Sequence, residues 1–170
     1  NGTSSSGTFP AGGLVFSLTL THEAENNMAQ NIHIGCDHAA LDLKNIIIRQ
    51  LEERGLTVTD HGTYTPESCD YPDIAHDVAQ AVEKENGTGI LLCGTGIGMS
   101  MAANHHKGIR AALCTTELHA KFARRHNDAN ILCLGARMTG VELAKAIVEA
   151  FLTTGFEGGR HKRRIDKIPC

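Results

Sequence analysis

The sequence predicts an α/β fold in which helices cover both faces of a parallel sheet. Five short apolar segments recur along the chain, and a longer amphipathic segment follows each of them. The apolar segments are nearly continuous rather than alternating, which is typical of strands buried on both faces. This succession favours right-handed β–α–β units. We therefore expect a three-layer α/β/α, doubly wound (Rossmann-like) sheet of five parallel strands with a C-terminal tail.

Each predicted strand is a run of apolar and β-branched residues that ends at a turn. In chain order the runs are IHIGC, LTVTD, GILLC, IRAALC and NILCLG, at residues 32–36, 56–60, 89–93, 109–114 and 130–135. In a doubly wound sheet, ligands bind beyond the carboxyl ends of the strands. The residues that follow these runs are therefore the first candidates for a functional site.

Apolar side chains recur at helical spacing after every strand. The predicted helices cover residues 39–54, 73–85, 98–106, 116–125 and 139–153. Gly55 is expected to end the first helix, and Asp73 and Thr116 are expected to cap the second and the fourth. Residues 155–170 form a basic tail that is expected to fray, to fold back over the site or to reach a neighbouring subunit.

Two regions are predicted along the chain. Residues 1–27 begin with a Gly-, Ser- and Thr-rich stretch and are expected to be a disordered or artificially added leader. Residues 28–170 are expected to form a single domain. The boundary is placed there because Met28 directly precedes the first clear strand.

Composition narrows the classes of function. The 170 residues carry a net charge of −3 with histidine neutral, so an extended nucleic-acid surface is not indicated. No apolar run approaches the roughly 20 residues that span a bilayer. The six cysteines include no C-x-x-C pair, and most of them lie in predicted strands as expected for reduced, buried thiols. We expect a cytoplasmic protein without nucleic-acid or membrane partners.

The ten histidines raise the question of a metal site. His105 and His106 are neighbours in the sequence, but adjacent side chains on a helix point apart. Both are therefore expected on the solvated surface. We expect no metal and no other cofactor.

The third predicted strand ends at an unusual turn. In CGTGIG, residues 93–98, glycine stands at every second position between the strand and a helix. Glycine lets backbone amides approach a ligand closely, and a helix N-terminus favours negative charge. The turn lacks the lysine of a nucleotide-binding P-loop and the spacing of a dinucleotide fingerprint. A smaller anion, a phosphate or a developing oxyanion, fits it better.

Cys93 stands where this turn begins. A helix N-terminus can activate a thiol at such a position. Asp37 and His38 follow the first strand and Arg137 follows the fifth, so the fold predicts them at the same edge of the sheet. A thiol, a carboxylate, a histidine and arginine together suit proton transfer on a small phosphorylated substrate.

Five sequence blocks in the same order resemble type B ribose-5-phosphate isomerase, and more broadly the family that includes the subunits of galactose-6-phosphate isomerase. They are GCDHAA (35–40), CDYPDIA (69–75), CGTGIGMSMAANHHKGIRA (93–111), RRHNDANILCLGAR (124–137) and EGGRHKRRI (157–165). The resemblance covers about residues 32–168. It implies interconversion of ribose 5-phosphate and ribulose 5-phosphate in the pentose phosphate pathway. It further implies a homodimer with shared active sites, with a tetramer as the alternative.

The resemblance also implies a role for each matching residue. Cys93 would move a proton between two substrate carbons, Thr95 would serve the neighbouring oxygens, and His126 would open the sugar ring. The main chain of Gly94, Gly96, Ile97 and Gly98 would hold the enediolate. Sugar contacts would come from Asp37, Tyr71 and Asn127, and phosphate contacts from His38, Arg137, Arg160 and Arg164.

Several alternatives stay open from the sequence. A six-carbon sugar phosphate, allose or galactose 6-phosphate, would require the same types of residue. A sugar-phosphate-binding protein without turnover is a second alternative, although both Cys93 and His126 are present. Asp37 can also cap the first helix, and His161 is a second candidate for ring opening.

Overall fold

The computed structural model describes residues 31–168, so the predicted leader at residues 1–27 lies outside the described residues. Within the described range, five strands form one sheet in the order β2-β1-β3-β5-β4, and every neighbouring pair is parallel. The strands are β1 (Asn31–Cys36), β2 (Thr57–Asp60), β3 (Thr88–Cys93), β4 (Ala111–Leu113) and β5 (Ile131–Gly135). The predicted doubly wound parallel sheet is confirmed.

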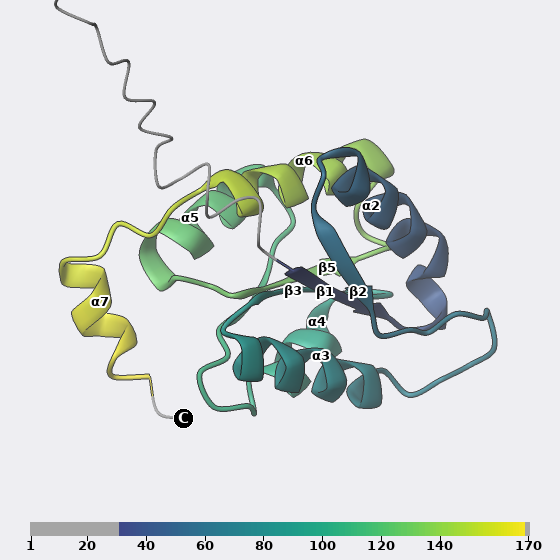
Figure 1. Cartoon of the computed structure of the whole chain (residues 1–170), viewed down its shortest axis with the longest axis horizontal. Coiled ribbons are helices and arrows are strands. Elements are labelled where there is room, and N and C mark those ends of the chain that lie inside the picture. The colour runs from purple at the N-terminus through teal and green to yellow at the C-terminus, as the bar shows by residue number, and fades with distance from the viewer. Residues whose placement is uncertain (1–30, 169–170) are drawn as a thin grey trace, which may run out of the picture.

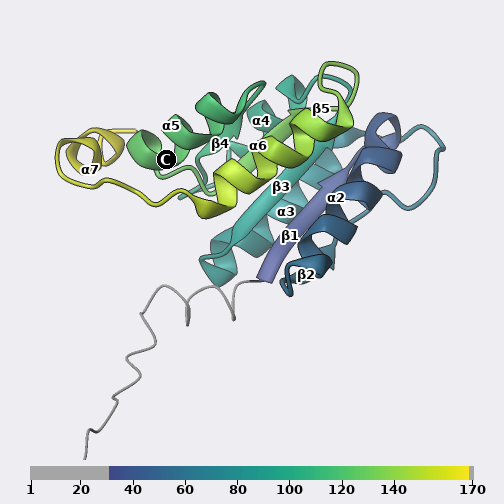
Figure 2. The same cartoon turned by 90° about the horizontal axis from the view of Figure 1, so that it is seen from above.

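Helices cover both faces of this sheet, as Figures 1 and 2 show. They are η1 (His38–Ala40), α2 (Leu41–Glu53), α3 (Tyr71–Glu85), α4 (Ile97–Ala103), α5 (Glu117–Asn127), α6 (Val141–Thr153) and α7 (Arg160–Ile165). Helices α2, α5 and α6 pack on one face, and α3 and α4 pack on the other. Helix α7 stands at the side of the sheet and contacts α5.

Burial on both faces explains why the strand sequences are unbroken apolar runs. Along β3, Ile90 and Leu92 belong to the core under α2, α5 and α6, whereas Leu91 and Cys93 belong to the core under α3 and α4. Successive side chains of a strand point to opposite faces, so each face receives every second residue. Each fully buried aliphatic side chain contributes about 2 kcal/mol through the apolar surface it removes from water.

Helix α3 begins at Tyr71, two residues before the predicted start. Its N-cap is Asp70, and Pro72 stands in the first turn, where the missing amide costs little because that amide has no partner within the helix. The prediction that Asp73 caps the helix is therefore wrong. Asp73 lies inside the first turn, where its charge interacts favourably with the helix dipole.

Strand β4 and helix α4 are both shorter than predicted, for one shared reason. The side-chain amide of Asn104, which follows α4, donates to the carbonyl of Ala111 at 3.0 Å and accepts from its amide at 2.8 Å. These bonds satisfy backbone groups of Ala111 at the edge of the sheet. The structure thus ends α4 at Ala103 and begins β4 at Ala111.

Four other sequence-based expectations can be compared with the structure. Thr116 caps α5, because its hydroxyl accepts from the amide of His119 at 3.1 Å. The basic tail does not fray up to residue 168 but forms α7. The cysteines from Cys36 to Cys133 are free thiols, and all of them except the half-buried Cys69 are buried. The helices formed by residues 31–168 include none with the length and hydropathy of a membrane span.

Candidate active site

Three loops meet at the carboxyl edge of the sheet, where β1, β3 and β5 end. The backbone joins them directly: the amide of Asp37 donates to Leu92 at 3.1 Å, and the amide of Arg137 donates to Gly94 at 3.0 Å. The loop after β1 and the loop after β3 flank the point where the chain reverses its direction across the sheet. In doubly wound folds this switch point is where ligands bind.

The glycine turn after β3 packs so tightly against the end of β5 that neither Gly96 of the turn nor Gly135 of the strand leaves room for a side chain. Gly96 adopts φ +80°, and a Cβ there would lie 2.5 Å from Leu113 Cδ1 and 2.9 Å from the carbonyl carbon of Leu134. A Cβ on Gly135 would lie 2.6 Å from the backbone of Thr95. The turn therefore lies directly on the end of β5, and only glycine permits this approach.

Cys93 is buried at the base of this turn, with 5% of its surface exposed. The amide of Gly96 donates to its Sγ at 3.0 Å, so a backbone N–H faces the sulfur. The amide of Ile97 donates to Thr95 Oγ1 at 3.3 Å, and the Thr95 side chain is exposed at the edge. Two of the four predicted main-chain donors are thus directed at the candidate sulfur and hydroxyl.

The other buried cysteines differ from this arrangement. Burial raises the pKa of Cys36 to about 12 and that of Cys114 to about 12. Burial also raises the pKa of Cys133, with the neighbouring Cys114 and Cys93 adding to the effect. These three thiols are therefore protonated at neutral pH and are poor candidates for a nucleophile or a base.

The remaining predicted residues of this edge surround the turn. A Cβ on Gly98 would lie 2.6 Å from the Tyr71 ring, and one on Gly94 would lie 3.3 Å from the Arg137 guanidinium. Asp37 is buried, and its Oδ1 caps η1 by accepting from the amide of residue 39 at 2.9 Å. His38 is held by the amide of residue 69, which donates to its Nδ1 at 3.3 Å. Asp37 and His38, with Tyr71 and Arg137, therefore lie around Cys93; we call this set the cysteine edge.

The structure does not bring His126, Asn127, Arg160 and Arg164 to the cysteine edge of the same chain. Helix α5 connects the carboxyl end of β4 to the amino end of β5, so its last residues lie at the opposite edge of the sheet. The Nε of Arg110, which precedes β4, donates to the carbonyls of Asn127 and Asp128 at 3.0 Å each. From Ile131 to Gly135 a strand rises roughly 13 Å, which separates the two groups within one chain.

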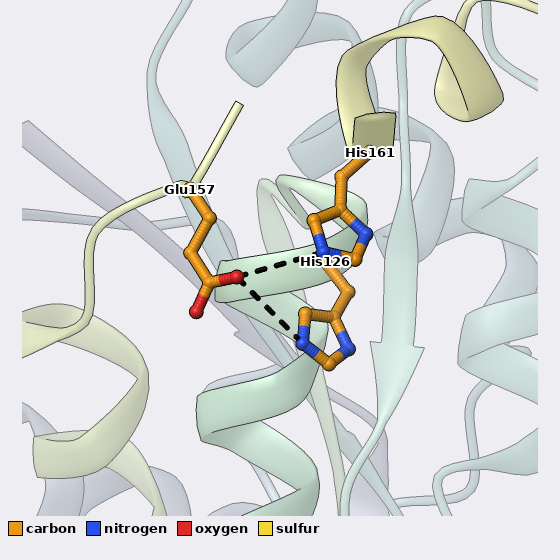
Figure 3. Close-up of side chains that lie close together, drawn as sticks. All are labelled: His126, Glu157 and His161. Atoms are coloured by element: carbon orange, nitrogen blue, oxygen red, sulfur yellow. Dashed lines mark ion pairs between the residues drawn. The ribbon is translucent and has the colours of Figure 1, made fainter. Parts of the chain in front are cut away.

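His126 belongs to a second cluster, drawn in Figure 3 with Glu157 and His161. The two imidazoles stack with centroids 4.3 Å apart and planes 10° apart, and Phe122 stacks on His126 at 4.8 Å. Glu157 Oε2 lies 3.5 Å from His161 Nε2 and 4.0 Å from His126 Nε2. Burial of the His161 ring, followed by the charges of His126 and Arg160, lowers the pKa of His161. We call these three residues the histidine–glutamate cluster.

Donor atoms of the histidine–glutamate cluster lie within 4.8 Å of one another, a spacing from which a metal ion could be bound. The surroundings oppose a cation. Arg125 Nε already pairs with Glu157 Oε1 at 2.8 Å, and Arg160 and Arg164 bring further positive charge to His161. Anion recognition fits this charge distribution better.

Sequence reasoning missed three features of the histidines and their partners. Glu157 had no assigned role, although its position four residues before His161 could have suggested the contact. His106 is not on the solvated surface as predicted: its Nε2 lies 2.7 Å from Nδ1 of His76, and both rings are half-buried. His33 is buried between His61 and a glutamate, a contact made across the sheet that local spacing does not indicate.

The sequence of this chain is similar to those of known sugar-phosphate isomerases. The profile of the Ribose/Galactose Isomerase family matches residues 32–168. Ribose-5-phosphate isomerase B of Escherichia coli (strain K12) is 49% identical over 140 residues, which are 82% of this chain and 94% of that protein. D-erythrulose-4-phosphate isomerase of Pectobacterium atrosepticum is also 49% identical, over 81% of this chain and 92% of that protein.

Solved structures agree with the sequence comparison. Ribose-5-phosphate isomerase B of Mycoplasma genitalium, with bound ribulose-5-phosphate, superposes with a TM-score of 0.81 at 47% identity, covering 83% of this chain and 95% of that chain. The enzyme from Clostridium thermocellum superposes with a TM-score of 0.81 at 49% identity, over 82% of this chain and 95% of that chain.

Proposed function

Because the chain belongs to the ribose/galactose isomerase family, we propose that it interconverts ribose 5-phosphate and ribulose 5-phosphate. The observation that carries the proposal is Cys93, buried at the switch point with a backbone amide on its sulfur. A relative with 47% identity was solved with ribulose-5-phosphate bound. The free thiols support a location in a reducing compartment, the cytoplasm, and we include that location in the proposal.

Isomerisation moves one proton between neighbouring carbons of the open-chain sugar. The Cys93 thiolate removes the proton from C2 of the aldose, and the electron pair forms a C1–C2 double bond with negative charge on O1. A proton passes from O2 to O1 beside the Thr95 hydroxyl. The Cys93 thiol then returns its proton to C1, which yields the ketose and regenerates the thiolate. Main-chain amides of the glycine turn would hold the oxyanion, and each well-placed donor lowers the activation free energy by roughly 3–4 kcal/mol.

The cyclic sugar must open before this step. Opening transfers a proton from the C1 hydroxyl to the ring oxygen, a task for which an imidazole is well suited. We assign it to His126. Since His126 and Cys93 lie at opposite edges of one chain, the proposal requires a homodimer in which His126 of one subunit meets Cys93 of the other.

The same topology assigns the remaining contacts to subunits. Asn127, Arg160 and Arg164 lie on α5 and α7 with His126, so one subunit supplies all four. The other subunit supplies the cysteine edge. Arginine side chains on α7 and the Arg137 guanidinium would hold the phosphate from two sides, which suits the bidentate geometry of arginine.

The test is turnover of ribose 5-phosphate by the purified protein in the presence of a chelator, beside Cys93→Ala. We expect activity that survives chelation and is lost in the variant. Allose 6-phosphate, galactose 6-phosphate and erythrose 4-phosphate form the substrate panel, since a relative of equal identity is named for a four-carbon substrate. Turnover of a six-carbon substrate alone would replace the pentose assignment, and sugar-phosphate binding without any turnover would establish a binding protein instead.

A further inference from the structure

Glu157 contacts residues of both α5 and α7, although the proposed chemistry assigns it no role. Its Oε1 accepts from Arg125 Nε at 2.8 Å, and its backbone amide donates to the carbonyl of Arg125 at 3.1 Å. Its Oε2 faces Nε2 of both histidines of the cluster, as the dashed lines in Figure 3 mark. One residue thus holds the last turn of α5 and the first turn of α7 together.

The chain between Glu157 and α7 provides little stiffness of its own. Gly158 and Gly159 both have positive φ, at +68° and +55°, and a Cβ on either would meet open space among the described residues. The carbonyl of Gly158 accepts from the amide of His161 at 3.0 Å and that of Gly159 from the amide of Arg163 at 3.5 Å, so these bonds join the pair to α7 and not to α5. The orientation of α7 then depends on contacts on either side of the glycine pair, those of Glu157 and the ring of His161.

His161 is the anchor on the far side of the glycine pair. Only 7% of its surface is exposed, its ring stacks on His126, and its Nε2 forms no hydrogen bond with any residue between 31 and 168. The nearest compensating group is the carboxylate of Glu157, 3.5 Å away. A buried imidazole nitrogen without a hydrogen bond is costly, so the charge of Glu157 contributes directly to keeping the ring in place.

We propose that Glu157 is a positioning residue for ring opening, which locks His126 and α7 into one rigid unit so that the ring-opening imidazole and the phosphate-binding arginines approach the substrate together. The inference rests on the proposed function of His126. Glu157 itself touches no reacting atom. Its effect is geometric and electrostatic, because misplacing a reacting group by about 1 Å can cost on the order of 100-fold in rate.

Charged groups around the cluster determine what its titration should look like. The charge of Glu157 raises the pKa of His161, and three neighbouring groups lower it: His126, Arg160 and Arg164. Removing the carboxylate therefore leaves only neighbours that disfavour the protonated ring. This gives a readout in the resting protein that does not depend on turnover.

The experiment compares Glu157→Gln and Glu157→Asp with Glu142→Gln, which changes a carboxylate that is 89% exposed on α6. For Glu157→Gln we expect kcat/KM for ribose 5-phosphate to fall at least 10-fold, with a rise in KM as well as a loss in kcat because α7 carries the phosphate arginines. Glu157→Asp keeps the charge but is one methylene shorter, so we expect partial rescue. Glu142→Gln should match the wild type.

Histidine proton resonances provide the second measurement. We expect His161 of Glu157→Gln to titrate at a lower pH than in the wild type, with the melting temperature almost unchanged. Wild-type kcat/KM in Glu157→Gln, or an unchanged His161 titration, would overturn the proposal. An enzyme inactive on every sugar phosphate whose His161 titration still shifts would refute the proposed function and leave the lock at Glu157 in place.

Discussion

Two variants that are inactive alone should restore activity when they share a dimer. Cys93→Ala removes the base from the cysteine edge, and His126→Ala removes the imidazole from the opposite edge. Loss of such a group typically costs 10²–10⁴-fold, so each variant should retain about 1% of wild-type turnover or less. The two positions lie at opposite edges of the chain, roughly 13 Å apart along the strands, so each composite site takes Cys93 from one subunit and His126 from the other.

Geometry also sets the size of the recovery. A mixed dimer has one site that carries both lesions and one that carries neither. Random reassortment of equal amounts makes half of the dimers mixed, and one of the two sites in each mixed dimer is intact. Roughly a quarter of all sites, and so of the wild-type activity, is therefore restored. The KM of the restored activity should equal that of the wild type, because the intact site is complete.

The assay mixes the two variants, exchanges subunits through mild denaturation and follows ribulose 5-phosphate formation. Each variant exchanged with itself is the first control. Cys93→Ala exchanged with the double variant is the second, and it should stay inactive because no site regains both groups. Activity that remains at the sum of the two parents after verified subunit exchange would refute the shared site, and a fully active His126→Ala parent would place His126 outside the reaction.

Three further predictions concern stability. Gly96→Ala should destabilise the fold by at least about 1–3 kcal/mol in urea unfolding, since φ is +80° and the added carbon would lie 2.5 Å from a neighbouring side chain. Gly55→Ala is the control, because Gly55 has φ +75° but open space around its Cβ position among the described residues, and it should lose less stability. Equal losses in the two variants would contradict the steric argument. Lys44 is fully buried, and its Nζ contacts the two carboxylate oxygens of Asp60 at 2.7 and 2.8 Å. Lys44→Met should lower the free energy of unfolding by about 3 kcal/mol, near the low end for a broken buried pair because Asp60 keeps some solvent contact. An unchanged free energy of unfolding would show that this pair is dispensable. Burial, followed by the charge of a neighbouring histidine, lowers the pKa of His61 below 6.5. The contribution of the neutral ring to stability is therefore complete above the unfolded pKa of 6.5 and is lost as the pH falls through the folded pKa. The free energy of unfolding, measured from pH 8 to pH 5, should fall less steeply in His61→Gln than in the wild type, and identical slopes would contradict this.

Local patterns in the sequence predicted the parts of the structure that local physics controls. Unbroken apolar runs indicated strands buried on both faces, and the confirmed sheet has them with end positions shifted by at most a few residues. Errors arose where a distant side chain decided the outcome. Asn104 satisfies the edge of β4 and so sets where that strand begins. His106 lies in the turn after α4 and contacts His76 on α3 rather than solvent alone.

By itself, the sequence determined the order of strands and helices and the glycine turn. It also determined the residue types at the carboxyl edge, because hydrophobic periodicity and backbone conformation are properties of neighbouring residues. The tertiary structure alone decided that His126 lies at the edge opposite Cys93 in the same chain. It also decided that Glu157 joins α5 to α7 beside two stacked imidazoles. These features arise from strand order and from contacts between segments that are more than thirty residues apart, such as His126 and His161. Local spacing in the sequence does not indicate such contacts.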